Sequence, residues 1–247
     1  MKQTNNYIIE IATTDFISTQ EAVAGGADRI ELCAALCEGG TTASMGMIRL
    51  CREKFETDLF PIIRPRGGDF LYTAEEFDVM VQDVILCREL GCNGIVTGLL
   101  QSDGSIDIRR TTLLIEKAFP MEVTFHRAFD RSRDPFEAME QLISIGCQRI
   151  LTSGQSPEAS QGLDLIAELV RQADERIIIM PGSGVRKDNI NEIRQKTGAF
   201  EFHSSLRGKI RSNMQFMHPA FAASEESYKN PFVHAHEVKE LREALGN

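Results

Sequence analysis

The chain has 247 residues, 42% of them apolar, which fits one large α/β domain or two small ones. Its formal net charge of −9 argues against nucleic acid as a partner, because binding a phosphate backbone needs a basic face. The polar first six residues precede no apolar signal region and no membrane-length run, so we expect a cytoplasmic protein without a membrane partner.

Eight short apolar runs predict β-strands, and helical patterns separate them. In chain order the predicted strands cover residues 7–12, 29–34, 59–64, 94–99, 122–128, 149–153, 176–180 and 200–204. Thr73, followed by Glu75 and Glu76, predicts the N-cap and acidic first turn of a helix that reaches about residue 90. Asp134-Pro135 places a proline in the first turn of another helix, through about residue 145.

A glycine ends a helix at four junctions and an apolar run follows each time, at Gly26, Gly91, Gly146 and Gly198. A junction that recurs in this way indicates a repeated strand–helix unit. Eight such units predict an α/β protein with a (β/α)8 TIM-barrel fold, and a doubly wound open sheet is the competing architecture.

The periodicity stops after Gly208. Residues 209–230 show no clear period, and residues 233–245 are again helical in pattern. We therefore expect a single barrel domain over residues 1–208. An irregular and helical C-terminal extension, residues 209–247, would pack on the barrel or on a neighbouring subunit.

Several charged residues interrupt the apolar strands, where they are costly unless they are paired or face a wet opening. Active sites of such barrels lie at the C-terminal ends of the strands. The candidate catalytic residues of this hypothetical pocket are Glu10, Glu31, His126, Asp130 and His203. His126 would act in acid–base chemistry with Asp130 to orient it, and Glu10 or Glu31 becomes a candidate base if it is buried. The competing interpretation is structural: ion pairs that stabilise the barrel end, and core histidines with satisfied hydrogen bonds.

Two glycine-containing segments predict a site for a small anion. Arg64 and Arg66 precede Gly67-Gly68, and the turn 181–185 follows the seventh predicted strand, where barrels often bind phosphate. The candidate anion-binding residues are Arg64, Arg66, Arg127, Ser153, Gly182, Ser183 and Gly184. The alternative is that the glycines serve only tight turns.

The six cysteines form no CxxC pair, a usage typical of a reduced cytosolic protein. Cys33 and Cys37 stand four residues apart, and two thiolates suit Cu(I). They are therefore the candidate metal ligands, although a free cysteine is more commonly a small core residue.

Segments spread along the chain resemble the CutC family, which is named for copper homeostasis. The resemblance is carried by residues 26–33 with 38–40, and by residues 63–72, 123–130, 150–155, 179–185 and 201–203. It implies a (β/α)8 barrel, a cytoplasmic location, and self-association as a homodimer or homotetramer. It also implies a role in copper tolerance or Cu(I) binding, with Cys33 as the first candidate ligand. Cu(I) is the one cofactor that we expect.

Two hypotheses for function therefore stand side by side. The resemblance favours a cytoplasmic CutC-type protein that binds copper. The residues favour an enzyme or sensor for a small phosphorylated or carboxylated metabolite, because arginine and glutamate suit oxygen-bearing ligands better than Cu(I). The sequence does not decide whether a reaction is catalysed.

Overall fold

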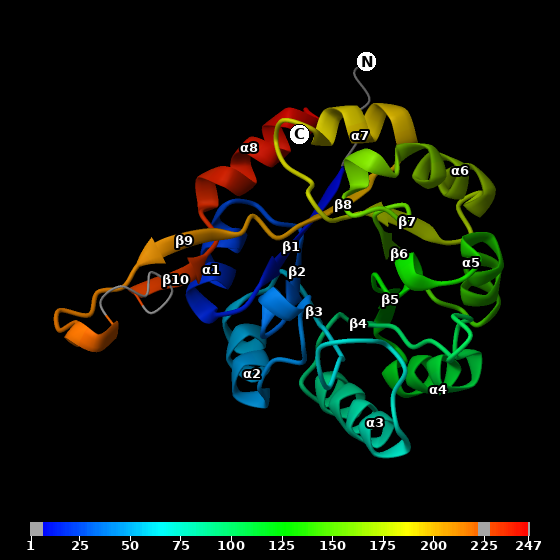
Figure 1. Cartoon of the computed structure of the whole chain (residues 1–247), viewed down its shortest axis with the longest axis horizontal. Helices are drawn as coiled ribbons and strands as arrows, with labels where there is room; N and C mark the ends of the chain where they lie inside the picture. The colour runs from blue at the N-terminus through cyan, green and yellow to red at the C-terminus, as the bar shows by residue number, and fades with distance from the viewer. Residues whose placement is uncertain (1–6, 222–227, 247) are drawn as a thin grey trace.

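The computed structural model describes residues 7–221 and 228–246. In this part of the chain a ring of parallel strands is surrounded by helices (Figure 1). The barrel strands are β1 (Ile8–Thr13), β2 (Arg29–Leu32), β3 (Asp58–Pro61), β4 (Gly94–Thr97), β5 (Glu122–Phe125), β6 (Arg149–Thr152), β7 (Ile178–Pro181) and β8 (Glu201–Ser204). The helices are α1 (Phe16–Ala24), α2 (Met45–Lys54), α3 (Ala74–Glu89), α4 (Ile108–Ala118), α5 (Pro135–Ser144), α6 (Leu163–Ala173), α7 (Ile190–Thr197) and α8 (Ala235–Leu245).

The hydrogen-bonded ladders run in the orders β3-β2-β1-β8 and β4-β5-β6-β7. The two groups join at the β3–β4 edge, where the Ile63 N–H donates to the Val96 carbonyl at 2.7 Å. At the other edge β7 meets β8 so closely that a Cβ on Gly182 would lie 3.2 Å from the His203 Cβ. The predicted (β/α)8 barrel is therefore confirmed, and the open doubly wound sheet is excluded.

Local sequence explains where the predicted helices begin. The Thr73 hydroxyl accepts a hydrogen bond from the Glu76 N–H, and the Glu76 carboxylate accepts one from the Thr73 N–H, which is a capping box at the start of α3. The Asp134 carboxylate accepts from two N–H groups of the first turn of α5, with Pro135 at its first position. Both predicted helix starts are confirmed.

The barrel interior is charged as well as apolar. The Glu201 carboxylate, at the start of β8, accepts hydrogen bonds from Arg29 at 2.8 Å and from the Nε of Arg149 at 2.5 Å. All three side chains are buried. The helices pack over the outside of the strands through a large apolar cluster. Arg29, Arg149 and Glu201 are the first residues of their strands, so this charged network lies toward the N-terminal ends of the strands. The space for a ligand lies at the opposite, C-terminal ends.

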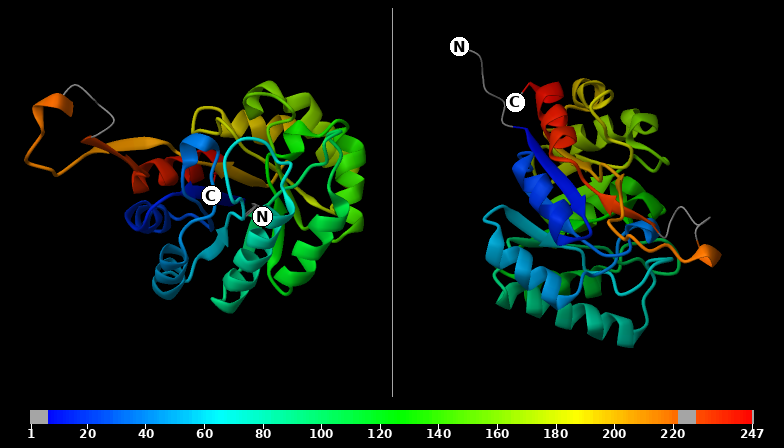
Figure 2. Two further views of the ribbon diagram at one scale, coloured as in Figure 1. Left: turned by 60° about the horizontal axis from the view of Figure 1, so that its bottom comes forward. Right: turned by 90° about the vertical axis from the view of Figure 1, so that its left-hand side faces the viewer.

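The chain after β8 leaves the barrel and returns to it. Strands β9 (Gly208–Arg211) and β10 (Lys229–Phe232) form an antiparallel ribbon that projects from the barrel (Figures 1 and 2). The ribbon is mostly exposed, so it lacks the apolar alternation by which a strand is predicted, and the sequence predicts no strand in this segment. Helix α8 then packs against α1 and α7 and completes the outer layer. The division at residue 208 stays a prediction, since this last barrel helix comes from the predicted extension. None of the described helices is long and apolar enough to cross a bilayer.

Candidate functional site

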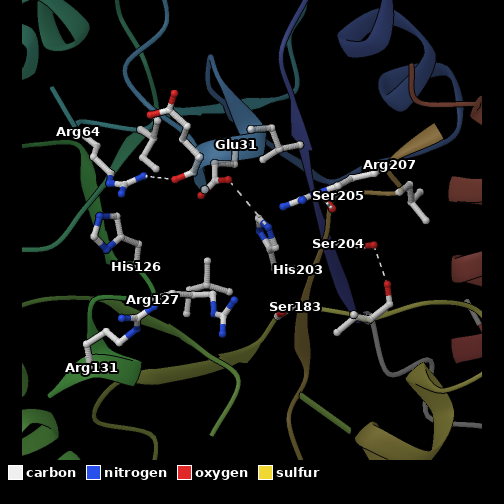
Figure 3. A pocket seen from close by; sticks show the side chains of 18 of the residues that line it. Glu31, Arg64, His126, Arg127, Arg131, Ser183, His203, Ser204, Ser205 and Arg207 are labelled. Atoms are coloured by element: carbon white, nitrogen blue, oxygen red, sulfur yellow. Dashed lines mark hydrogen bonds and ion pairs between the residues drawn. The ribbon is translucent and has the colours of Figure 1, made fainter. Parts of the chain in front are cut away.

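Loops from several strands surround a cavity of about 250 Å³ at the C-terminal end of the barrel (Figure 3). Glu31 lies in β2, His126 follows β5, and His203 lies in β8. Figure 3 shows these three side chains pointing into the same space. The strand-end rule applied to the sequence thus finds the cavity, although these residues are far apart along the chain.

Glu10, His203 and Glu31 form a buried chain of polar contacts. Glu10 in β1 is in register with His203 in β8, and its Oε1 lies 2.7 Å from the His203 Nδ1. The other ring nitrogen, Nε2, lies 3.9 Å from the Glu31 Oε2. Neighbouring strands therefore bring two carboxylates to opposite sides of one imidazole.

The surroundings of Glu10 and Glu31 shift the pKa values of the two carboxyl groups in opposite directions. Burial opposes ionisation of Glu10, but the hydrogen bond from His203 and the charge of Arg29 outweigh it and lower the pKa of Glu10 to about 2. Burial raises the pKa of Glu31 to about 7, against the opposing effect of the His203 charge. Burial lowers the pKa of His203, yet Glu31 and Glu10 together raise it above its usual value. Glu31 is thus a carboxyl group that gains and loses its proton near neutral pH, as a general acid or base must.

His126 is held as a neutral ring. Its Nδ1 accepts a hydrogen bond from the Ala128 N–H at 3.1 Å, so the proton of the neutral imidazole is on Nε2. Burial, followed by the charge of Arg64, lowers the pKa of His126 to about 3. Asp130 does not orient this ring, contrary to the expectation from the sequence. Its carboxylate instead accepts hydrogen bonds from Arg127 at 2.8 Å and from the hydroxyls of Thr152 and Ser153. These bonds connect the loop after β5 to the end of β6 and the loop after it.

The cavity is basic although the chain is acidic. Five arginines and two glutamates line it, and the arginines are Arg64, Arg127, Arg131, Arg186 and Arg207. The Arg64 guanidinium donates to the carbonyls of Glu38 and Gly40 and so fixes the loop after β2. In the described part of the chain, Arg131 and Arg186 are exposed and form no salt bridge. Their charges are therefore available to an anionic ligand.

The turn after β7 offers backbone donors to the same cavity. Ser183 and Gly184 have φ values of 74° and 73°, and with Val185 they line the cavity. Within the described ranges, the N–H groups of these three residues donate to no protein acceptor. Successive free N–H groups of this kind form an anion-binding nest. Gly182 has a different reason to be glycine, because a Cβ there would lie 2.4 Å from Leu151.

Other predicted site residues lie outside the cavity. Arg66 pairs with Glu76 and Asp69 at the surface and does not line the cavity. Cys33 is fully buried among Phe60, Ile62 and Val96, where burial raises the pKa of its thiol. Cys37 is exposed, in a short 3-10 helix (Leu36–Glu38). The structure therefore does not bring the two thiols together in one open site.

Sequence reasoning missed Arg131, Arg186 and Arg207, which line the cavity from the loops after β5, β7 and β8. Their position in loops that follow strands is the available signal, but arginines are common in solvated loops, so position alone does not select them. The pairing of Arg29 and Arg149 with Glu201 was also missed, because residues at strand beginnings carry no sign of the partner across the barrel.

The fold and the cavity define a TIM-barrel protein with a basic cavity, lined by titratable side chains, at the C-terminal ends of its strands. The model of the CutC family matches residues 7–208, and the chain belongs to this family. A CutC family protein of Parabacteroides distasonis is 55% identical over 210 residues, covering 85% of this chain and 86% of the relative. One of Chromobacterium violaceum is 46% identical over 241 residues, covering 96% and 98%. The crystal structure of a CutC protein of Streptococcus agalactiae, described as a candidate copper homeostasis protein, superposes with a TM-score of 0.78 at 31% identity and covers 81% of this chain and 98% of its own.

Proposed function

We propose that the protein binds a small phosphorylated or carboxylated metabolite in the cavity and transfers a proton on it with Glu31. The observation that carries this proposal is the concentration of five arginines around a cavity in a chain of net charge −9. A cavity in which one sign of charge predominates, here five arginines against two glutamates, attracts ligands of the opposite sign. The free N–H groups of the turn at Ser183 and Gly184 add directional donors for the oxygens of the anion.

The acid–base role falls on Glu31 because of what surrounds it. Glu31 is only 5% exposed, lines the cavity, and has a pKa of about 7. His203 lies between Glu31 and the ionised Glu10. The negative charge of Glu10 stabilises the protonated imidazole from the side opposite Glu31. A base of this pKa is matched to proton transfer at neutral pH.

The anion site is tested by thermal unfolding with inorganic phosphate and a panel of small phosphorylated and carboxylated compounds. A compound present at 100 times its Kd stabilises the folded state by about 2.7 kcal/mol, which raises the Tm by roughly 5–10 °C for a chain of this size. We expect Arg186→Ser and Arg131→Ser to reduce this shift by at least about half.

The matched control is Arg109→Ser, on the exposed side of α4 and away from the cavity, which leaves the shift unchanged. The proposal is wrong if no compound raises the Tm of the wild type more than that of Arg186→Ser.

A copper-homeostasis role is the second candidate function, and its support is the description of the Streptococcus agalactiae relative. The residues do not fit a Cu(I) ion held by Cys33 and Cys37. The Cys33 thiol donates to the Thr13 carbonyl at 3.4 Å inside an apolar cluster, and burial favours its protonated form. Metal ligation needs the thiolate. Among the described residues, the cluster whose donor atoms lie within 4.8 Å of one another is Glu10, Glu31 and His203, and it has no sulfur.

An anaerobic titration with a Cu(I) chelator in competition measures whether Cys33 binds copper. We expect Cys33→Ser to take up the same amount of Cu(I) as the wild type, because a buried, protonated thiol makes no bond to the ion. Cys37→Ser is the control for an exposed thiol. One equivalent bound by the wild type and lost only in Cys33→Ser would contradict this account.

We also propose a cytoplasmic location and self-association as a homodimer or homotetramer, as the family resemblance implies. The six free thiols are typical of a reducing compartment. Met214 and Phe216, 65% and 69% exposed after β9, offer apolar surface for contact with a second copy. Light scattering on the purified protein tests the oligomeric state.

A further inference from the structure

The Nε2–H group of His126 is a buried donor without a partner. His126 is 4% exposed, and in the described part of the chain its Nε2 makes no hydrogen bond. The Ala128 N–H fixes the tautomer by occupying Nδ1. A buried donor without an acceptor destabilises the folded protein, and a ligand atom that accepts from it removes that cost.

The packing around His126 prevents the ring from turning toward a protein acceptor. The Phe70 ring lies with its centroid 5.0 Å from the imidazole centroid. Gly98 also approaches the ring, so closely that a Cβ at this position would lie 2.4 Å from Nδ1. The donor is therefore held in one orientation before any ligand binds, which is the property that makes a donor effective in catalysis.

A fixed positive charge lies in the same wall of the cavity. The terminal nitrogens of Arg64 donate to the carbonyls of Glu38, Gly40 and Gly68, and its guanidinium also interacts with the buried Tyr72 hydroxyl. Arg64 lines the same cavity as His126, and its charge acts on the imidazole. A neutral N–H beside a fixed positive charge suits an oxygen that becomes negative during a reaction.

The anionic group of the ligand has other donors. The turn at Ser183 and Gly184, with Arg186, supplies N–H groups and a charge from the loop after β7. His126 comes from the loop after β5 and stays neutral, so it adds no charge for an anion to bind. Its partner is then a neutral oxygen acceptor on another part of the same ligand.

We propose that the substrate is a phosphorylated or carboxylated aldehyde or ketone, whose carbonyl oxygen accepts from the His126 Nε2–H while Glu31 removes a proton from the adjacent carbon. This inference rests on the proposed function and names its substrate class. The ionised Glu31 carboxylate takes the proton, the C–H electron pair forms the C=C bond, and the carbonyl π pair moves to the oxygen. His126 and Arg64 stabilise the resulting enolate, and return of the proton from Glu31 restores the carbonyl, so no oxidant or reductant is needed.

The test measures exchange of that carbon-bound proton with solvent. Phosphorylated and carboxylated aldehydes and ketones are incubated with the protein in D2O, and each is paired with the alcohol made by reducing its carbonyl; dihydroxyacetone phosphate and glycerol 3-phosphate are one such pair. NMR reports deuterium at the carbon beside the carbonyl. We expect at least one carbonyl compound to exchange, His126→Gln to slow it at least about 100-fold, and Glu31→Gln to abolish it.

The outcomes separate this inference from the proposed function. If the alcohols raise the Tm as much as the carbonyl compounds and nothing exchanges, the carbonyl inference is overturned while the anion site stands. If no compound raises the Tm, both fail. Exchange at the wild-type rate in a folded His126→Gln overturns the role of His126.

A measurement on the wild type covers the case in which His126→Gln does not fold. The 15N resonance of the His126 Nε2 should shift when the carbonyl compound binds and remain in place when its reduced alcohol binds. Equal shifts with both members of each pair would also overturn the inference.

Discussion

Replacing Glu201 by glutamine is expected to lower the free energy of unfolding by about 3–5 kcal/mol. Glu201 is 4% exposed and accepts from both Arg29 and Arg149 inside the barrel. Glutamine keeps the size of the side chain but removes its charge, which leaves two buried guanidinium groups with less compensation. Urea unfolding at neutral pH measures the loss.

The control for this substitution is Glu140→Gln. Glu140 also pairs with an arginine, Arg176, but the two side chains are 53% and 44% exposed. Exposed pairs contribute about 0–1 kcal/mol, because water and salt screen them. Equal losses for Glu201→Gln and Glu140→Gln would show that the buried network does not hold the barrel together.

The second large effect concerns Glu31→Gln and depends on pH. The pKa of Glu31 is about 7 in the folded protein, against an ordinary value of 4.5. A raised pKa means that the folded state binds the proton more tightly than the unfolded chain does. Its stabilising contribution is therefore complete below pH 4.5 and is lost as the pH rises through 7. As the pH rises from 4.5 to above 7, we expect the free energy of unfolding of the wild type to fall by about 3 kcal/mol relative to that of Glu31→Gln.

The measurement is the difference in free energy of unfolding between the two proteins at several pH values from about 4.5 to 8. Comparison with Glu31→Gln removes the contribution of groups that titrate alike in both. Gln161→Ala, an exposed substitution without a titrating group, is the control and should follow the wild type at every pH. A difference that stays constant over this range would mean that Glu31 ionises alike in the folded and unfolded chain.

The fold is largely predictable because its signals are local. Each glycine of the four junctions ends a helix at a position where a left-handed residue is needed, and Gly26, Gly91, Gly146 and Gly198 all have positive φ. The capping box at Thr73 likewise involves residues three apart. The ribbon of β9 and β10 escapes prediction, since its pairing joins residues that are distant in sequence and its exposed strands need no apolar period.

The site is predictable in part. Titratable residues inside apolar strands are unusual, and this alone points to Glu10, Glu31 and His203, which the structure brings together. Their catalytic roles stay a prediction. Partners could not be predicted, as Asp130 shows: its closeness to His126 along the chain suggests an oriented histidine, yet its carboxylate crosses to the next strand and binds Thr152 and Ser153.

The most direct test of the functional site is a crystal structure of the protein with the phosphorylated compound that raises its Tm most. We predict electron density in the cavity, with the phosphate at the turn of Ser183 and Gly184 and the rest of the compound between Glu31 and His126. Density for the compound outside this cavity, with the cavity filled only by water, would contradict the central claim that these strand ends form the functional site.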